Sequence, residues 1–211
     1  MRTLQGWYLP DTDTDFDRWL LDGNYQKQQR DTILRFLKMQ DIQFENCIDV
    51  GAHVGFWLKD LCKRFKNVYA FEPISEVREC LVKNITDKNY TLFPFALGNE
   101  NKTTKVNYIP EATGNTYISD EGNREIELKR LDDLELPKIE YIKIDAEGFE
   151  IEVLKGGKNL IEKYKPFIHV EVKGKVLVKQ GLTNDDIVNY FDSINYKRLL
   201  SVSSEHVYGP K

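Results

Sequence analysis

A glycine-containing loop near residue 50 has the residue types of a nucleotide-binding turn. Ile48 and Val50 are typical of a buried strand that ends at this loop. Gly51 permits a sharp bend, and Gly55 permits a ligand or the strand to approach the first turn of the following helix. A loop at the carboxyl end of a first strand cradles a nucleotide. Asp49, inside the strand, could orient the loop, bind a ligand amine through water, or cap the loop amides structurally.

The glycine spacing distinguishes between kinds of nucleotide site. Gly51 and Gly55 stand as G-x-x-x-G, whereas a dinucleotide fingerprint requires G-x-G-x-x-G and a phosphate loop requires a following Lys-Ser/Thr pair. The loop is therefore not built to bind a pyrophosphate. Glu72 follows the next apolar run, roughly 20 residues later, where an acidic residue binds both hydroxyls of a ribose. A solvated carboxylate at a strand end is the alternative for Glu72.

A later apolar strand carries charged residues on one face. Tyr141, Lys143 and Asp145 alternate along that face. An unpaired buried lysine would lose its proton or cost several kcal/mol, so we expect Lys143 to form a salt bridge with Asp145, Glu171 or Asp49. The group is either a structural network or a site tuned for proton transfer.

Carboxylates at the ends of these strands are candidates for a general base. Asp145 is the first choice and Glu171 the second, because Lys143 can keep one of them ionised while the other faces a substrate. Glu147 is expected to begin the next helix, where a negative charge is favourable. Asp145, Glu147 and Glu171 could together bind a divalent metal ion, which we do not expect. The three histidines do not have the spacing of metal ligands.

Apolar strands alternate with amphipathic helices through most of the chain. Strands are predicted at 46–50, 67–71, 90–97, 139–144 and 167–172, followed by a hairpin of 196–202 and 206–208. Helices are predicted at 28–37, 58–65, 77–85 and 149–160, and a further one begins at the capping box of 183–186. Such alternation predicts a parallel sheet with right-handed crossovers and helices on both faces.

Six motifs of this chain occur in the order typical of one enzyme family. They are Asp49-Val50-Gly51-Ala52-x-Val54-Gly55, Ala70-Phe71-Glu72-Pro73, Ala96-Leu97-Gly98, Leu131-Asp132-Asp133-Leu134, Lys143-Ile144-Asp145-Ala146-Glu147-Gly148 and Val153-Leu154-Lys155-Gly156. In these motifs the chain resembles the FkbM-type family of class I S-adenosylmethionine-dependent methyltransferases. The resemblance covers residues from about 46 to 171. It implies a three-layer, Rossmann-like α/β fold with a mostly parallel seven-stranded sheet and an antiparallel C-terminal hairpin.

The resemblance also implies a binding site for S-adenosylmethionine. The residues expected to bind this cofactor are Tyr25, Asp49, Gly51, Ala52, His53, Gly55, Phe56, Glu72, Pro73, Ala96, Leu97 and Asp145. Phe95 would flank the adenine together with Ala96 and Leu97. An aromatic residue followed by glutamate is frequent in the family near the position of Tyr25, whereas this chain has Gln26 there. Tyr25 could equally be ordinary packing.

Two segments lie outside the alternating pattern. Residues 1–24 carry too many large apolar side chains for a free tail, so 1–44 is expected to form a helical cap. Residues 102–108 and 124–129 alternate polar and apolar residues, which predicts a small hairpin within a β insertion at 99–130. The resemblance implies that this insertion lies near the mouth of the active site, although a plain surface turn is the alternative for its Gly114-Asn115-Thr116 segment.

The resulting functional hypothesis is an enzyme that methylates a hydroxyl on a glycan or a small metabolite. The alternatives are methylation of a nitrogen on a small molecule or peptide, and a cofactor-binding module without turnover. An NAD-dependent oxidoreductase is disfavoured because the third glycine of the fingerprint is missing. In the main hypothesis Asp145, Glu171 and Lys143 are the catalytic residues.

Composition limits the other possibilities. The 211 residues suffice for one α/β domain, and 41% of them are hydrophobic and 30% charged. The formal net charge of −4 and the scattered lysines and arginines argue against a nucleic-acid partner. We find no apolar run long enough to span a membrane and no leader peptide, and therefore expect a cytoplasmic protein. The three cysteines are expected to be reduced core thiols, and no oligomeric state is indicated.

Overall fold

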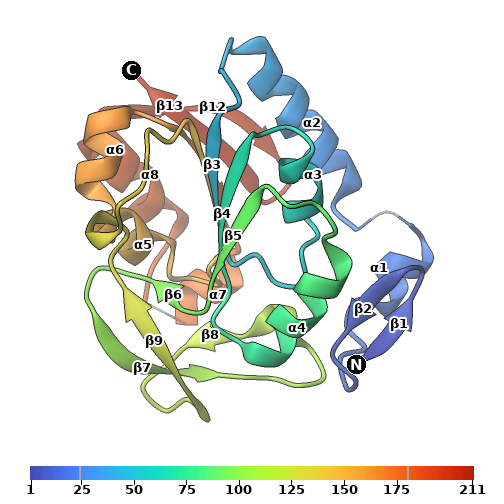
Figure 1. Ribbon diagram of the computed structural model, residues 1–211. Helices are drawn as coiled ribbons and strands as arrows, with labels where there is room; N and C mark the ends of the chain where they lie inside the picture. The colour runs from blue at the N-terminus through green and yellow to red at the C-terminus, as the bar shows by residue number, and fades with distance from the viewer. Residues whose placement is uncertain (24, 180) are drawn as a thin grey trace.

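A seven-stranded sheet forms the centre of the protein (Figure 1). The computed structural model describes residues 1–23, 25–179 and 181–211. The strands run in the spatial order β12 (Tyr196–Val202), β13 (Glu205–Pro210), β11 (Phe167–Glu171), β10 (Tyr141–Ile144), β3 (Asn46–Val50), β4 (Asn67–Phe71) and β5 (Tyr90–Phe93). Strand β13 is antiparallel to both of its neighbours, and the other pairs are parallel. The expected mostly parallel sheet with an antiparallel C-terminal hairpin is thus confirmed.

Helices cover both faces of this sheet because the central strands bury apolar side chains on each face. On one side lie α2 (Lys27–Met39), α3 (Leu58–Cys62) and α4 (Ser75–Asn84), and on the other lie α5 (Glu150–Gly156), α6 (Lys158–Tyr164) and α8 (Asn184–Ser193). Strand β3 shows the division: Cys47 packs in the core under α2 and α3, whereas Ile48 and Val50 pack in the core under α5 and α6. Helix α8 begins with the expected capping box between Thr183 and Asp186.

A second, four-stranded sheet lies beside the carboxyl ends of the central strands (Figure 1). Its order is β6 (Ala96–Leu97), β9 (Arg124–Lys129), β7 (Lys102–Asn107) and β8 (Tyr117–Ile118). The expected hairpin is the antiparallel pair of β7 and β9. The single strand expected at 90–97 is wrong, because β5 and β6 belong to different sheets. Pro94 stands between them and has no N–H to continue a strand ladder.

The N-terminal 44 residues contain more than helices. A hairpin of β1 (Arg2–Leu4) and β2 (Trp7–Leu9) precedes α1 (Asp17–Leu21) and α2. The Asn84 side chain on α4 accepts a hydrogen bond from the Tyr8 N–H at 2.7 Å and donates one to the Tyr8 carbonyl at 2.9 Å. Leu9 and Phe16 pack in a third core cluster with Phe56 of the glycine loop. The segment is therefore attached to α4 by hydrogen bonds and to the loop after β3 by apolar packing.

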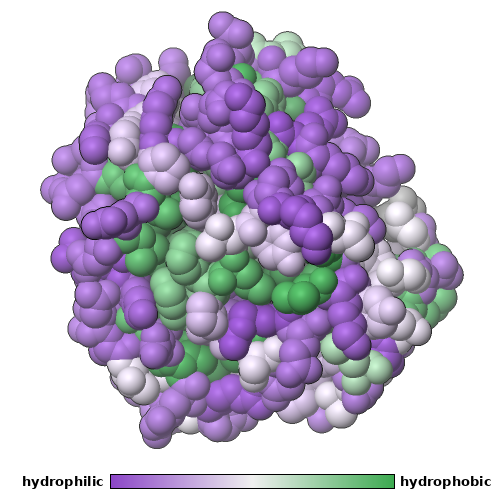
Figure 2. Space-filling view, viewed as in Figure 1, coloured by the Kyte–Doolittle hydropathy of each residue, from purple (hydrophilic) through white to green (hydrophobic). Residues whose placement is uncertain are grey.

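The remaining differences from the expected elements are local. The helix expected at 149–160 is divided at Gly156 and Gly157, where a side chain on Gly156 would come within 1.8 Å of the Gly98 carbonyl. Helix α7 (Gly174–Lys179) was not expected. The three cysteines are buried free thiols in the described chain. Within the described residues, no helix combines the length and the apolar character that a membrane crossing requires. Figure 2 shows that hydrophilic residues cover most of one face, with hydrophobic residues gathered in a band across its middle.

Candidate active site

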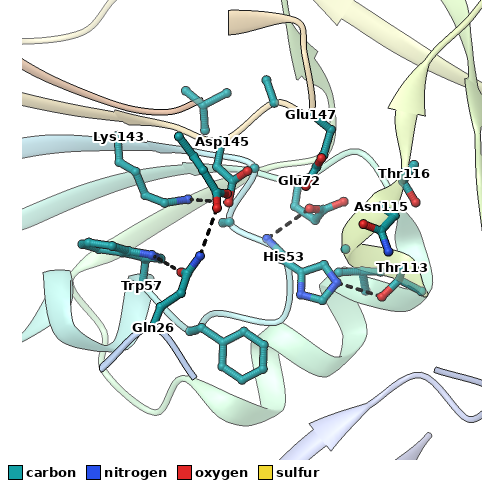
Figure 3. Close-up of a pocket in the computed structure, with 18 of the residues that line it drawn as sticks. Gln26, His53, Trp57, Glu72, Thr113, Asn115, Thr116, Lys143, Asp145 and Glu147 are labelled. Carbon is teal, nitrogen blue, oxygen red and sulfur yellow. Dashed lines mark hydrogen bonds and ion pairs between the residues drawn. The ribbon is translucent and has the colours of Figure 1, made fainter. Parts of the chain in front are cut away.

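A cavity of about 980 Å³ opens at the carboxyl ends of β3, β4, β10 and β11. The N-terminal segment and the short 3-10 turn η1 (Thr113–Asn115) of the insertion form its other walls. Figure 3 shows Lys143 pointing toward Asp145 across from the insertion residues Thr113 and Asn115. A volume of this size lies at the upper end of the range for ligand pockets in proteins. The cavity can therefore hold a nucleoside cofactor together with a second substrate.

The glycine loop after β3 forms part of the cavity wall. Gly51 has a φ of +72°, which an L side chain rarely adopts, and the N–H groups of Gly51 and Ala52 both donate to the Phe71 carbonyl at 3.0 Å. A Cβ on Gly51 would lie 2.0 Å from the carbonyl oxygen of Asp145. Only glycine therefore fits at position 51, because the end of β10 lies too close for a side chain. This requirement holds whether or not a ligand is bound.

Glu72 lines the cavity with a carboxylate held in place by backbone groups. Its two oxygens accept hydrogen bonds from the His53 N–H at 3.1 Å and the Ile74 N–H at 2.9 Å. The residue is buried, and this burial raises the pKa of Glu72 to about 7. Both oxygens retain accepting capacity, because a carboxylate oxygen can accept more than one hydrogen bond.

Lys143 has two carboxylate partners in the sheet. Its Nζ lies 3.4 Å from Asp49 Oδ1 and 3.5 Å from Asp145 Oδ2, which confirms the expected salt bridge. Burial alone would lower the pKa of Lys143, but the charges of Asp49 and Asp145 outweigh it and raise that pKa. Asp49 is completely buried and does not line the cavity. Its position beside Lys143 makes it a counter-ion rather than a direct contact for a ligand.

A second lysine joins three carboxyl groups at the cavity wall. Lys173 Nζ contacts Glu147 and lies 3.1 Å from Glu171 Oε2 and 3.9 Å from Asp145 Oδ1. Oxygens of Asp145, Glu147 and Glu171 all lie within 4.8 Å of one another. The three carboxyl groups therefore share the Lys173 amine, and the cluster contains more carboxyl groups than lysines.

Asp145 and Glu171 share a hydrogen bond, and their protonation states differ. Burial and the charge of Asp145 raise the pKa of Glu171 to about 9. Burial would also raise the pKa of Asp145, but Lys143 and Lys173 outweigh it and lower that pKa. These opposite shifts in pKa favour a protonated Glu171 that donates to an ionised Asp145. Asp145 is consequently the member of this pair that can accept a proton.

Two members of this cluster differ from the sequence-based expectation. Glu147 does not begin the following helix: it has a φ of +48°, lines the cavity, and α5 starts at Glu150. Burial and the charge of Asp145 raise the pKa of Glu147 to about 7. Lys173 was not expected at the site. Its place two residues beyond the strand-end Glu171 is the one sequence signal that could have indicated it.

A hydrogen-bonded chain connects the glycine loop to the insertion and the N-terminal segment. His53 Nε2 lies 2.8 Å from Thr113 Oγ1, and the Thr113 hydroxyl donates to Asp13 Oδ2. Thr113 has one hydroxyl proton, so its oxygen accepts from the Nε2–H tautomer of His53. Burial lowers the pKa of His53 to about 4, so the ring is neutral near pH 7. Asp13 and Thr113 are fully or almost fully buried, and neither was expected at the site.

Gln26 links the start of α2 to the charged cluster. Its side-chain carbonyl accepts a hydrogen bond from Trp57 Nε1 at 2.7 Å, and its amide donates to Glu171 Oε1 at 3.4 Å. Gln26 has a φ of +46° and lines the cavity. The Tyr25 ring lies 4.5 Å from that of Phe56. Gln26, which stands where a glutamate is frequent in the family that the sequence resembles, is thus hydrogen-bonded directly to Glu171, one of the expected catalytic residues.

Most of the expected site residues line this one cavity. They are Tyr25, Gly51, Ala52, His53, Phe56, Glu72, Pro73, Ala96, Leu97, Lys143, Asp145 and Glu171. Asp49 and Gly55 do not line it; Gly55 instead faces Ile85, which a Cβ would approach to 2.9 Å. Phe95 also lies away from the cavity, because its ring packs against Phe93 and Phe71 at centroid distances of 5.5 and 5.7 Å.

Comparison with known proteins identifies relatives over most of the chain. A family model described as the methyltransferase FkbM domain matches residues 49–198. The hexuronic acid methyltransferase AglP of Haloferax volcanii is 30% identical over 151 residues, which are 68% of this chain and 62% of AglP. The chain therefore spans less than two thirds of the length of this curated relative.

Solved structures resemble this chain in fold. A methyltransferase FkbM from Methylobacillus flagellatus has a TM-score of 0.58 at 22% identity, and the match covers 78% of this chain and 43% of the solved chain. An S-adenosylmethionine-dependent methyltransferase from Clostridium acetobutylicum has a TM-score of 0.57 at 10% identity, covering 92% and 96%. The N-methyltransferase NodS from Bradyrhizobium japonicum has a TM-score of 0.56 at 7% identity, covering 88% and 97%. The expected class I methyltransferase fold is confirmed.

Proposed function

This chain belongs to the FkbM methyltransferase family, and from that membership we propose that it transfers a methyl group from S-adenosylmethionine to a hydroxyl of a glycan or a small metabolite. One structural observation carries the proposal. Glu72, a buried carboxyl group that can accept hydrogen bonds from a ribose, and Asp145, a carboxylate that can act as a base, line a single cavity at the strand ends. The sugar acceptor is suggested by the name of AglP, which describes a hexuronic acid methyltransferase.

The residues at the loop side of the cavity fit the proposed cofactor. Glu72 can accept hydrogen bonds from both ribose hydroxyls, because two backbone amides fix its carboxylate. The other expected cofactor contacts are Tyr25, Gly51, Ala52, His53, Phe56, Pro73, Ala96 and Leu97, which line the same cavity. When bound, the cofactor supplies an electrophilic methyl group on a sulfonium sulfur.

Asp145 is the proposed general base. The Asp145 carboxylate would take the proton of the acceptor hydroxyl, whose oxygen would receive the methyl group that bound S-adenosylmethionine would supply, with S-adenosylhomocysteine as the leaving group. Lys143 and Lys173 keep Asp145 ionised, and protonated Glu171 orients it through their shared hydrogen bond. The protein's other contribution is to align the reacting atoms.

We also propose that residues 1–211 act as a single methyltransferase domain. Residues 1–44 would be its cap, and 99–130 its insertion at the cavity mouth. Support comes from the core cluster that joins Leu9 and Phe16 of the N-terminal segment to Phe56 of the loop and Ile126 of the insertion.

The first experiment separates cofactor classes. S-adenosylhomocysteine is expected to raise the melting temperature, and NAD is expected to leave it unchanged, since only a ligand of the native state stabilises it. Stabilisation by NAD alone would support the oxidoreductase alternative. Binding of S-adenosylhomocysteine without methyl transfer to any hydroxyl or nitrogen acceptor would leave a binding module.

The second experiment tests the base with a matched pair of variants. Asp145→Asn is expected to lower turnover by about 10²-fold or more, with the affinity for S-adenosylhomocysteine within a few fold of wild type. Glu171→Gln is expected to retain most of the turnover, because an amide reproduces the hydrogen-bond donor of a protonated carboxyl. Full turnover in Asp145→Asn would remove this residue as the base.

A further inference from the structure

One face of α2 extends the cavity away from the strand ends. Lys27, Asp31 and Arg35 repeat every four residues, so they lie along one side of the helix, and all three line the cavity. From Lys27 to Arg35 the helix rises about 12 Å, at 1.5 Å per residue. This length is greater than a single sugar ring spans. The cavity therefore continues past the strand ends along this face of α2, and we call the face formed by Lys27, Asp31 and Arg35 the outer wall.

The charged groups of this wall are available to a ligand. The side chains of Lys27, Asp31 and Arg35 form no hydrogen bond or ion pair with any residue that the structure describes, and all three residues are exposed. Arg30, on another face of the same helix, is by contrast held by Asp60 at 2.9 Å and by the Tyr25 carbonyl. The charged side chains on the cavity face of α2 thus have no protein partner among the described residues, whereas Arg30 has two.

An exposed aromatic ring also lines the cavity. Trp19 of α1 is 45% exposed, and the guanidinium of Arg18 stacks on its ring at 4.4 Å. Large aromatic residues are normally buried for their apolar area, so an exposed one in a cavity wall is a candidate binding surface. The apolar C–H face of a sugar ring is suited to such a surface.

The polar chemistry of the wall favours hydroxyl groups as its ligand. Every α2 residue that lines the cavity is polar; these residues are Lys27, Gln28, Gln29, Asp31, Thr32 and Arg35. They offer donors and acceptors side by side, with charges of both signs, which matches groups that donate and accept at once. A peptide-binding groove would instead require apolar pockets for side chains. Nucleic acid would require a basic surface.

We propose that Trp19 and the α2 face of Lys27, Asp31 and Arg35 form an outer saccharide subsite. The acceptor is accordingly a glycan of at least two sugar rings, with the methylated ring beside Asp145 and the next ring on the outer wall. The inference rests on the proposed methyltransferase function and narrows its acceptor from glycans and small metabolites to glycans. The wall's position in the same cavity as the candidate base connects the two rings.

The test compares saccharides of different length on the intact protein. Glucuronic acid methyl glycoside and glucuronic-acid-terminated di- and trisaccharides are titrated in the presence of S-adenosylhomocysteine, with ligand-observed NMR as the readout. Neutral di- and trisaccharides and a mixed tripeptide library serve as further probes. Wild-type protein should bind a disaccharide about tenfold more tightly than the monosaccharide, which corresponds to about 1.4 kcal/mol.

Variants test whether the tighter binding of the disaccharide depends on Trp19 and the outer wall. Trp19→Ala and Asp31→Ala are expected to remove the tenfold gain in affinity and to leave monosaccharide affinity unchanged. Lys38→Ala is the matched control, because Lys38 is an exposed residue of the same helix that does not line the cavity. All three variants should bind S-adenosylhomocysteine within twofold of wild type, which also shows that they fold.

Several outcomes would overturn the subsite. These are equal affinity for mono- and disaccharides, an unchanged gain in both wall variants, an equal loss in Lys38→Ala, or binding of peptides but no saccharide. Absence of saccharide binding by a protein that binds S-adenosylhomocysteine would reject the subsite and leave cofactor use standing. Absence of S-adenosylhomocysteine binding would instead reject the proposed function.

Discussion

The two sides of the cavity are held in different ways. On the strand side, Lys143 and Asp49 are direct partners in the register of β10 and β3, so the backbone ladder itself brings their side chains together. On the opposite side, Asp13, Thr113 and His53 meet through a few hydrogen bonds of the Asp13 and Thr113 side chains, between segments up to 100 residues apart. Positions on the strand side are fixed by the sheet, and those on the opposite side by individual side chains.

The comparison separates stability from ligand binding. A change on the strand side disturbs buried charges that the sheet cannot move apart, and its main effect should be on folding. A change at Glu72, beside the glycine loop, should act mainly on how ligands are held, and a change on the opposite side should act mainly on how firmly the N-terminal segment is attached. Each prediction below tests this division on one residue, beginning with the largest expected effect.

Lys143→Met should destabilise the protein by about 3–5 kcal/mol, because it leaves Asp49 buried without a counter-ion. The measurement is urea unfolding at pH 7. The double variant Asp49→Asn with Lys143→Met should recover a large part of the loss, since it removes both charges. A loss below about 1 kcal/mol in the single variant would show that the buried pair does not stabilise the strand side.

Glu72→Gln should weaken S-adenosylhomocysteine binding by about 1–3 kcal/mol through loss of charge-assisted hydrogen bonds, with little change in melting temperature. The wild-type affinity should also depend on pH. With the pKa of Glu72 raised to about 7, the carboxylate that accepts from a ribose is present above this pH and is lost as pH falls through it.

Calorimetry from pH 5.5 to 8.5 measures both effects. Wild-type affinity should fall by about tenfold per pH unit below pH 7, and the variant should lose most of this dependence. A variant with the same pH profile as wild type would assign the titration to another group, such as Glu147, whose pKa is also raised to about 7.

The strand side was largely predictable from sequence. Alternation of apolar residues located β3, β10 and β11, and the charges on one face of β10 required a buried partner for Lys143. Asp49 lies buried beside Lys143 and outside the cavity lining, which strand position alone does not indicate, and its expected contact with the cofactor amine through water stays a prediction. Pro94 was the missed signal for the division of the strand at 90–97.

The opposite side was much less predictable. Strands β1 and β2 have three residues each, too few to show an alternation. The contact of Asp13 with Thr113 depends on the paths of two loops rather than on any local pattern. Glu147 took a left-handed backbone conformation in place of the expected helix start, and a single non-glycine residue gives no sign of this in sequence.

The smallest expected change in stability comes from the hydrogen bonds that join Thr113 of the insertion to His53 and Asp13. Thr113→Val keeps the shape of the residue but removes the hydroxyl that joins His53 to Asp13, and should cost about 1 kcal/mol of stability. Thr113→Ser retains the hydroxyl and is the matched control. Urea unfolding measures the stability, and trypsin cleavage after Arg18 reports opening of the N-terminal segment. If single side chains hold this side of the cavity, the valine variant should be cleaved faster than the serine variant and wild type, with an unchanged turnover for bound acceptor. Equal cleavage of all three proteins would show that the Thr113 hydroxyl is not needed to hold the segment, which is then held by the apolar cluster of Leu9, Phe16 and Phe56 and by its other hydrogen bonds.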